Sequence, residues 1–234
     1  MKIRHLRISF IVALFLLLGS AQDGFSQTEP PPVGSWYIYN GFFNLNPKVE
    51  LFFDSQARLY EPISNIQVFF LRPYFNYNFT SNFQLGLGLE YHDSWTYDEV
   101  PENKVKSNEF RITLQSMLFQ KIDFVSVQHR YRYEFRTINT EAAQRMRYRL
   151  QLTIPFKGKP IEKGDWFATV GNEIMVDTQP DLDLSQNRTY GLIGYQITKG
   201  LNFQTGYMRL FFPTRAGENR LQFFLTQKLY FYER

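Results

Sequence analysis

The chain has 234 residues, of which 44% are hydrophobic and 18% aromatic, and it contains no cysteine. So many aromatic residues exclude a disordered protein, and the lack of thiols excludes a disulfide scaffold and a cysteine-ligated metal site. No segment beyond the N-terminus approaches 18 consecutive apolar residues, which excludes a bundle of membrane-spanning helices. The formal net charge of +4 suggests nucleic acid or an anionic surface as a partner only if the basic residues are exposed.

The N-terminal segment has the three parts of a secretory signal peptide, which we assign to residues 1–21. Three basic residues precede an apolar run over residues 8–18, and small residues follow up to Ala21. Cleavage after Ala21 and cleavage after Ser26 both fit the pattern. Removal at Ala21 leaves 23 basic residues against 22 acidic ones, so the net charge falls to +1. The basic balance therefore belongs mostly to the signal peptide.

From residue 48 onwards, apolar and polar residues alternate with a period of two, which is typical of strands with one apolar face. Odd positions from Phe83 to Tyr91 are apolar, whereas even positions from Gln84 to His92 are polar or glycine. No later segment shows helical periodicity. The pattern predicts ten strands, at about 48–60, 66–79, 83–92, 107–120, 124–136, 145–156, 165–176, 186–197, 201–212 and 220–231.

The connections between these segments alternate in length. Short ones are expected at 80–82, 120–123, 156–164 and 198–200, and longer or more polar ones at 93–106, 137–144, 177–185 and 213–219. Outer-membrane barrels combine short periplasmic turns with longer outer loops. We therefore expect an all-β fold, a transmembrane antiparallel up-and-down β-barrel of about ten strands, with twelve as the alternative, over residues 48–234.

Alternation alone does not say which face points inward. A soluble barrel would fill its interior with the apolar face, and a membrane barrel would turn that face to lipid. The glycines lie mostly on the polar face, the charged positions mix Arg with Glu, and aromatic residues gather near strand ends. These three features favour the membrane barrel.

Residues 22–47 are expected to be a periplasmic leader, and their proline run at 30–32 fits an extended segment. If the last strand descends to the periplasm, ten strands close consistently. An eleventh strand at residues 36–44 would leave the N-terminus outside the cell. We therefore predict that this segment is not a full spanning strand.

Short motifs along the mature chain resemble one family of outer-membrane barrels. They are Gly34-Ser-Trp36, Gln56-Ala-Arg58, Arg72-Pro73-Tyr74, Glu109-Phe-Arg111 with Gln115, His129 to Arg136, Arg145 to Leu150, Asn187-Arg188 before Gly191 and Gly194-Tyr195, and Gly206-Tyr207. Their order resembles Domain of Unknown Function 2490, a family common in Bacteroidetes-type Gram-negative bacteria. The resemblance implies a barrel in the cell outer membrane, embedded in the lipid bilayer and inserted by the barrel-assembly machinery. It implies no catalytic residue.

Charged residues on the polar face are the candidate functional site. They are Glu50, Arg58, Arg72, Glu90, Glu109, Arg111, Arg130, Arg132, Glu134, Arg136, Arg145, Arg147, Arg149, Glu173, Arg188 and Arg220. Buried charges must be paired, so we expect an Arg/Glu network that fills the lumen of a monomeric, non-enzymatic barrel. The alternative is a narrow anion-permeable pore, because rings of arginine select anions.

A further alternative is a lipid- or peptide-processing hydrolase, suggested by the run His92-Asp93-Ser94. Adjacent strand residues point in opposite directions, so a triad built from this run is not expected. Two histidines in the mature chain and no thiol argue against a metal, and we expect no cofactor. Because the arginines are expected inside the barrel, we expect no nucleic-acid partner.

Overall fold

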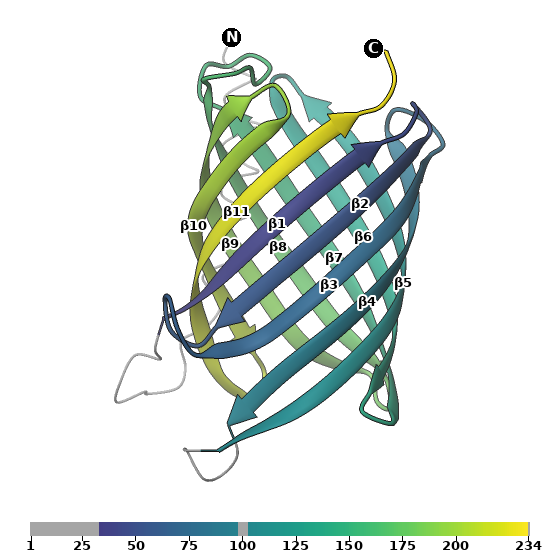
Figure 1. Ribbon diagram of the computed structural model, residues 1–234, viewed down its shortest axis with the longest axis vertical. Helices are drawn as coiled ribbons and strands as arrows, with labels where there is room; N and C mark the ends of the chain where they lie inside the picture. Colours follow the sequence, from purple (N-terminus) through teal and green to yellow (C-terminus); the bar gives the residue numbers. More distant parts are fainter. Residues whose placement is uncertain (1–32, 98–102, 234) are drawn as a thin grey trace. The chain divides into compact units, whose positions relative to one another are not determined.

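The computed structural model describes residues 33–97 and 103–233, and this part of the chain forms one closed barrel (Figure 1). The predicted signal peptide over residues 1–21 and both cleavage sites lie outside the described residues. No helix in residues 33–97 and 103–233 is long and apolar enough to cross a membrane. The strands are β1 (Gly34–Asn44), β2 (Val49–Leu59), β3 (Ile66–Asn78), β4 (Phe83–Tyr97), β5 (Lys104–Ile122), β6 (Val125–Ile138), β7 (Glu141–Pro155), β8 (Trp166–Gln179), β9 (Asp183–Thr198), β10 (Leu201–Phe212) and β11 (Arg215–Tyr230).

The barrel has eleven strands, so the prediction of ten, with twelve as the alternative, is wrong. The additional strand is β1, which pairs with β2 in antiparallel and with β11 in parallel, from Gly34 opposite Arg220 to Asn44 opposite Tyr230. In Figure 1, β1 and β11 lie side by side and their arrows point the same way. The prediction that residues 36–44 form no full strand is therefore also wrong.

The error has a topological cause. The prediction required both ends of the barrel segment to lie on the same side, which allows only an even number of strands. A parallel ladder hydrogen-bonds the first and last strands of an odd-numbered barrel and closes the sheet equally well. Residues 34–44, which the sequence assigned to the leader over 22–47, thus form part of the barrel wall.

Loop lengths also differ from the prediction. We call the end at which β11 finishes the C-terminal end of the barrel, and the opposite end, at which β1 starts, the N-terminal end. Turns of two residues, at 139–140 and 213–214, replace the long loops expected at the N-terminal end over 137–144 and 213–219. The polar residues that were taken for loops belong to the strands, which extend beyond the apolar part of the outer face at this end. The connection at 156–165, which was expected to be short, has ten residues.

The two faces of the wall are sorted as the membrane version predicts. Outward residues such as Leu87 and Leu114 are each 50% exposed, whereas the inward residues Glu134 and Arg72 are 0% and 4% exposed. Exposed aromatic residues gather towards both ends of the outer face. Near the C-terminal end they include Phe79, Phe156, Trp166 and Phe231, and towards the N-terminal end they include Tyr37, Tyr91, Tyr97, Phe110 and Phe135.

Inward aromatic rings fit over glycines on neighbouring strands. Tyr74 lies opposite Gly88, Phe167 opposite Gly194 and Tyr190 opposite Gly171. A Cβ atom added at any of these glycines would overlap the facing ring. Six buried apolar residues form a cluster on β1, β9 and β10, which consists of Trp36, Ile38, Tyr190, Leu192, Met208 and Leu210. The lumen therefore has a charged sector and an apolar sector.

The parallel seam can be tested by a disulfide, since the native chain contains no cysteine. Tyr39 and Leu225 are direct partners across the seam, so Tyr39→Cys combined with Leu225→Cys should cross-link under mild oxidation. The control, Tyr39→Cys with Leu221→Cys, displaces one thiol by about 13 Å along the strand and should stay reduced. Cross-linking is measured by non-reducing gel and peptide mass spectrometry. Equal cross-linking in both pairs would contradict the register.

Ring-over-glycine packing predicts that Gly88→Ala destabilises the barrel. The new methyl group must displace the Tyr74 ring, and overpacking of this kind costs about 1–3 kcal/mol. Gly191→Ala is the matched control, because no heavy atom lies within 4 Å of its added Cβ. Denaturant unfolding in detergent measures both variants. Equal midpoints for the two would show that the ring moves aside freely.

Candidate functional site

Eight charged side chains, one from each of eight successive strands, alternate in sign across the lumen. From β2 to β9 they are Asp54, Arg72, Glu90, Arg111, Glu134, Arg147, Glu173 and Arg188. Neighbouring members approach with N–O distances between 2.6 and 3.7 Å. Their side chains are at most 11% exposed. We call this set the charge belt.

Strand register brings the members of the charge belt together. Asp54 is the direct cross-strand partner of Arg72, and Glu173 is that of Arg188. Glu90 and Arg111 are direct partners as well. Other links run diagonally, since Arg147 faces Arg132 across the ladder yet reaches Glu134 instead. The fork of a guanidinium makes such sharing possible. Arg72, Arg111 and Arg147 thereby each join three strands.

Two arginines show how one guanidinium binds two carboxylates. Arg72 donates from Nη2 to Asp54 at 2.6 Å and from Nη1 to Glu90 at 2.8 Å. Arg147 donates from Nη1 to Glu134 at 2.6 Å and from Nη2 to Glu173 at 2.9 Å. Charge-assisted bonds of this length are the strong ones, and here they are shielded from solvent.

Trp36 links the two ends of the charge belt through β1. The guanidinium carbons of Arg58 and Arg188 lie 3.8 and 5.0 Å from its ring centroid, which is cation–π geometry. Arg58 donates to Gln56 at 3.0 Å, and Gln56 donates to Asp54 at 3.0 Å. The contacts therefore run round the lumen and return to the first member of the belt.

The other predicted site residues lie on both sides of the belt. Towards the N-terminal end, Glu109 contacts Arg111 and Arg136, and Asp177 contacts Arg136 and Arg145. Arg220 pairs with Glu218 near the same end. Towards the C-terminal end, Glu50 accepts hydrogen bonds from Asn76 and Gln84 and stands apart from the arginines.

Arg130, Arg132 and Arg149 lie on the C-terminal side of the belt. Arg130 contacts Glu173 at 2.7 Å. Arg132 donates to Gln115 at 2.8 Å, and Arg149 donates to Gln128. Within residues 33–97 and 103–233, neither Arg132 nor Arg149 has a carboxylate within 4 Å.

Sequence reasoning missed several members of the network. Asp54 shares the inward phase of its strand with Glu50 and Arg58, so the alternation could have identified it. Asp177 and Glu218 were missed because they fall in segments that were expected to be loops. Trp36 was missed because its strand was assigned to the leader. Gln56, Gln115 and Gln128 give no charge signal, although they bind arginines.

His92, Asp93 and Ser94 do not converge. His92 Nε2 lies 2.8 Å from Glu90 Oε2, and its ring stacks on Phe70 inside the lumen. Asp93 accepts a hydrogen bond from Tyr91 at 3.1 Å, and Ser94 donates to the backbone of Ser107. These contacts place His92 next to the charge belt and give it no serine partner. In the described ranges, no group of three or more His, Asp or Glu side chains is arranged to hold a metal ion.

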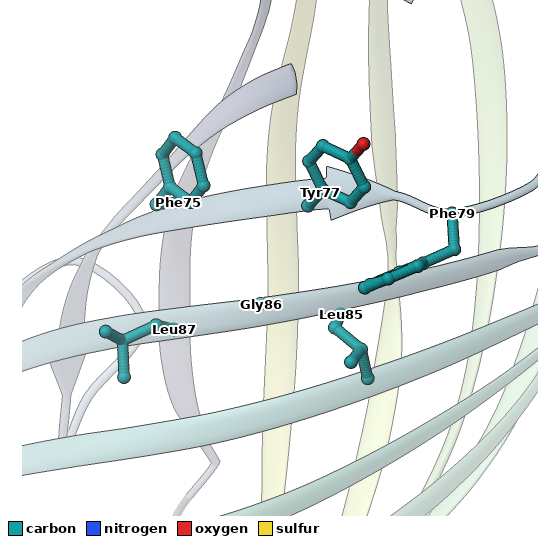
Figure 2. A pocket seen from close by; sticks show the side chains of 6 residues that line it. All are labelled: Phe75, Tyr77, Phe79, Leu85, Gly86 and Leu87. Carbon is teal, nitrogen blue, oxygen red and sulfur yellow. The ribbon is translucent and has the colours of Figure 1, made fainter. Parts of the chain in front are cut away.

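The outer wall carries a shallow apolar depression, which Figure 2 shows between β3 and β4. Its lining is Phe75, Tyr77, Phe79, Leu85, Gly86 and Leu87. The surface it exposes is almost entirely apolar, so it offers no chemistry for catalysis. It belongs to the outward apolar face.

A comparison with protein families gives one match. The model described as "Protein of unknown function (DUF2490)" matches residues 33–222. The matched segment begins just before β1 and ends within β11, so it covers all the members of the charge belt. No curated protein and no solved structure matches the chain.

Breaking the charge belt at its centre should destabilise the barrel. Glu134 is fully buried and binds Arg147 while facing Arg111, so Glu134→Gln leaves two buried guanidiniums undercompensated. Removing one partner of a buried ion pair costs about 3–5 kcal/mol, and the new amide oxygen should place this variant near the lower bound. Denaturant unfolding measures the loss. Glu162→Gln, in an exposed pair with Lys159, is the control and should leave the midpoint unchanged.

Proposed function

The chain belongs to the DUF2490 family of proteins of unknown function, and from that premise we propose that it is an integral outer-membrane β-barrel whose lumen the charge belt closes. Its role is structural rather than catalytic. The observation that carries the proposal is the sorting of side chains, with apolar residues on the outside of the wall and paired charges inside it. A soluble barrel requires the opposite sorting.

The outer face supports the location in a membrane. Soluble monomers rarely expose apolar patches larger than a few hundred Å², whereas apolar residues here are exposed on every strand from β1 to β11. On β4, Phe83 and Tyr91 are separated by about 26 Å of strand at roughly 3.3 Å per residue. A tilt of about 40° reduces this to about 20 Å along the barrel axis, near the thickness of the apolar band of outer-membrane barrels.

The charge belt supports a closed lumen. A solute that passed it would have to separate buried Arg–carboxylate pairs such as Arg147–Glu173, which lie 2.9 Å apart. Breaking such pairs is strongly destabilising, so the belt opposes a free anion pore. An outer face that is apolar on every strand fits a monomer surrounded by lipid, which the barrel-assembly machinery would insert.

Purified protein tests both parts of this proposal. After expression in a Gram-negative host, the chain should fractionate with the outer membrane, and its gel mobility should shift on heating. In planar bilayers the wild type should show no conductance steps at high salt, because the belt blocks the lumen. Arg147→Ala combined with Glu173→Ala removes two adjacent members of the belt and should permit conductance.

The two readouts separate the parts of the proposal. A soluble protein without a heat-dependent shift would remove the membrane assignment. Steady conductance in the wild type would remove the closed lumen and favour the narrow anion pore. Arg209→Ala combined with Asn219→Ala, a bonded pair on β10 and β11 outside the belt, is the control and should stay closed.

A further inference from the structure

Three arginines gather on the C-terminal side of the charge belt, and we call Arg130, Arg132 and Arg149 the arginine triad. Arg130 on β6 and Arg149 on β7 are direct cross-strand partners. Arg132 lies two residues further along β6, on the same inward face. Direct partners have Cβ atoms about 5 Å apart, and diagonal ones about 7–8 Å apart. The three guanidiniums therefore share one small region of the lumen.

The triad has fewer carboxylate partners than arginines. Among the described residues, Glu173 is the one carboxylate that contacts it, at 2.7 Å from Arg130 and directly opposite Arg149 in the ladder. Glu173 already binds Arg147 and lies 3.7 Å from Arg188, so its charge is shared. Arg132 and Arg149 bind only neutral amide oxygens, those of Gln115 and Gln128, among the described hydrogen bonds. The region therefore holds an excess of positive charge.

Several buried donors of the triad have no acceptor in the described part of the chain. They are Nη1 of Arg132 and Nε of Arg130 and of Arg149. Arg132 is only 3% exposed, so bulk water does not accept hydrogen bonds from its guanidinium. Buried charges and donors without partners are costly, and like charges directly opposite each other destabilise a sheet. An acceptor with negative charge would offset both costs.

The opposite side of the belt shows that the excess is local. There, Arg136, Arg145 and Arg220 each meet a carboxylate. Arg58 is held by Gln56 and lies over the rings of Trp36 and Phe70. The triad thus differs from Arg136, Arg145 and Arg220, because only one of its three members contacts a carboxylate.

Neutral hydrogen-bonding groups surround the triad and continue towards the C-terminal end. The hydroxyl of Tyr190 donates to Gln151 at 2.8 Å, and the Tyr74 ring lies 4.9 Å from the Arg132 guanidinium. Beyond them, the inward residues include Asn76, Gln84, Thr169 and Gln204, of which Asn76 and Gln84 donate to Glu50. Amides and hydroxyls of this kind can solvate an anion without competing for the arginines.

We propose that the arginine triad binds a small oxyanion, a carboxylate or a phosphate group, in the C-terminal half of the lumen. The planar guanidinium fork matches both groups in a bidentate manner, which gives the site its chemical class. The bound oxyanion supplies the acceptors that the triad lacks and offsets its charge. This site requires neither a membrane location nor a closed lumen, so it goes beyond the proposed function.

Titration of the purified mature chain in detergent tests the site. Inorganic phosphate and acetate are titrated separately at constant ionic strength, with isothermal calorimetry and the denaturant midpoint as readouts. We expect saturable binding of at least one of the two and a rise in the wild-type midpoint. Arg132→Gln and Arg149→Gln should each weaken binding by about tenfold or more, since each removes charge-assisted hydrogen bonds.

The control is Arg145→Gln, which removes a lumen arginine paired with Asp177 on the other side of the belt and should leave the affinity unchanged. Without added anion, Arg132→Gln should unfold at an equal or higher denaturant concentration than the wild type, because it relieves unpaired charge. If Arg132→Gln does not fold, by the heat-shift criterion, Arg149→Gln decides alone.

The outcomes separate the two ligand chemistries. Saturation by phosphate alone identifies a phosphate site, saturation by acetate alone a carboxylate site, and saturation by both a general oxyanion site. A response that never saturates, or an affinity that is the same in the wild type and both triad variants, overturns the proposal. A failure of the membrane assignment would leave the titration unaffected, so the two proposals fail separately.

Discussion

The arginine that binds carboxylates on two neighbouring strands is the interaction on which the barrel depends. Arg72 and Arg147 each do this, and Arg111 adds weaker contacts on both sides, so the strands from β2 to β8 are joined inside the lumen as well as along the wall. The side-chain period is two, and a slip of one residue would turn these charges outward and the apolar residues inward. The belt therefore specifies strand register as well as filling the lumen.

The apolar sector explains why β1 matters beyond closing the sheet. Trp36 and Ile38 pack with side chains from β9 and β10, where the lumen contains few charges. The same Trp36 ring meets Arg58 on one strand and Arg188 on another. One side chain thus completes both the apolar cluster and the circuit of contacts that begins and ends at Asp54. A barrel without β1 would lose sheet closure and the continuity of its interior together.

Alternation such as that in Phe83–His92 was enough to predict the strand type and to place the charges on one face of the wall. The positions of the glycines, the mixture of Arg with Glu and the aromatic residues near strand ends were needed to predict that this face points inward. The pattern fails for β1, since Tyr37, Ile38 and Tyr39 are apolar on both faces and show no period. The pattern also does not predict which charged side chains bind each other. Arg147 binds Glu134 instead of its direct partner because side-chain length permits a diagonal, and residue type alone does not specify that choice. The lengths of the loops at 137–144 and 213–219 were overestimated because polar residues there were taken as the end of a strand, whereas the strands continue through them.

The parallel seam between β1 and β11 has a consequence for the order of folding. Every other neighbouring pair of strands is joined by a connection close in sequence and can form by zipping from it, whereas the seam joins the two extremes of the barrel. Its closure carries the entropy cost of a loop that includes the whole wall, which makes it a slow step and the last one. Until it forms, β1 and β11 both present edges of unpaired backbone groups, which are open to pairing with other chains. Seam closure is therefore the event that commits the chain to its folded state.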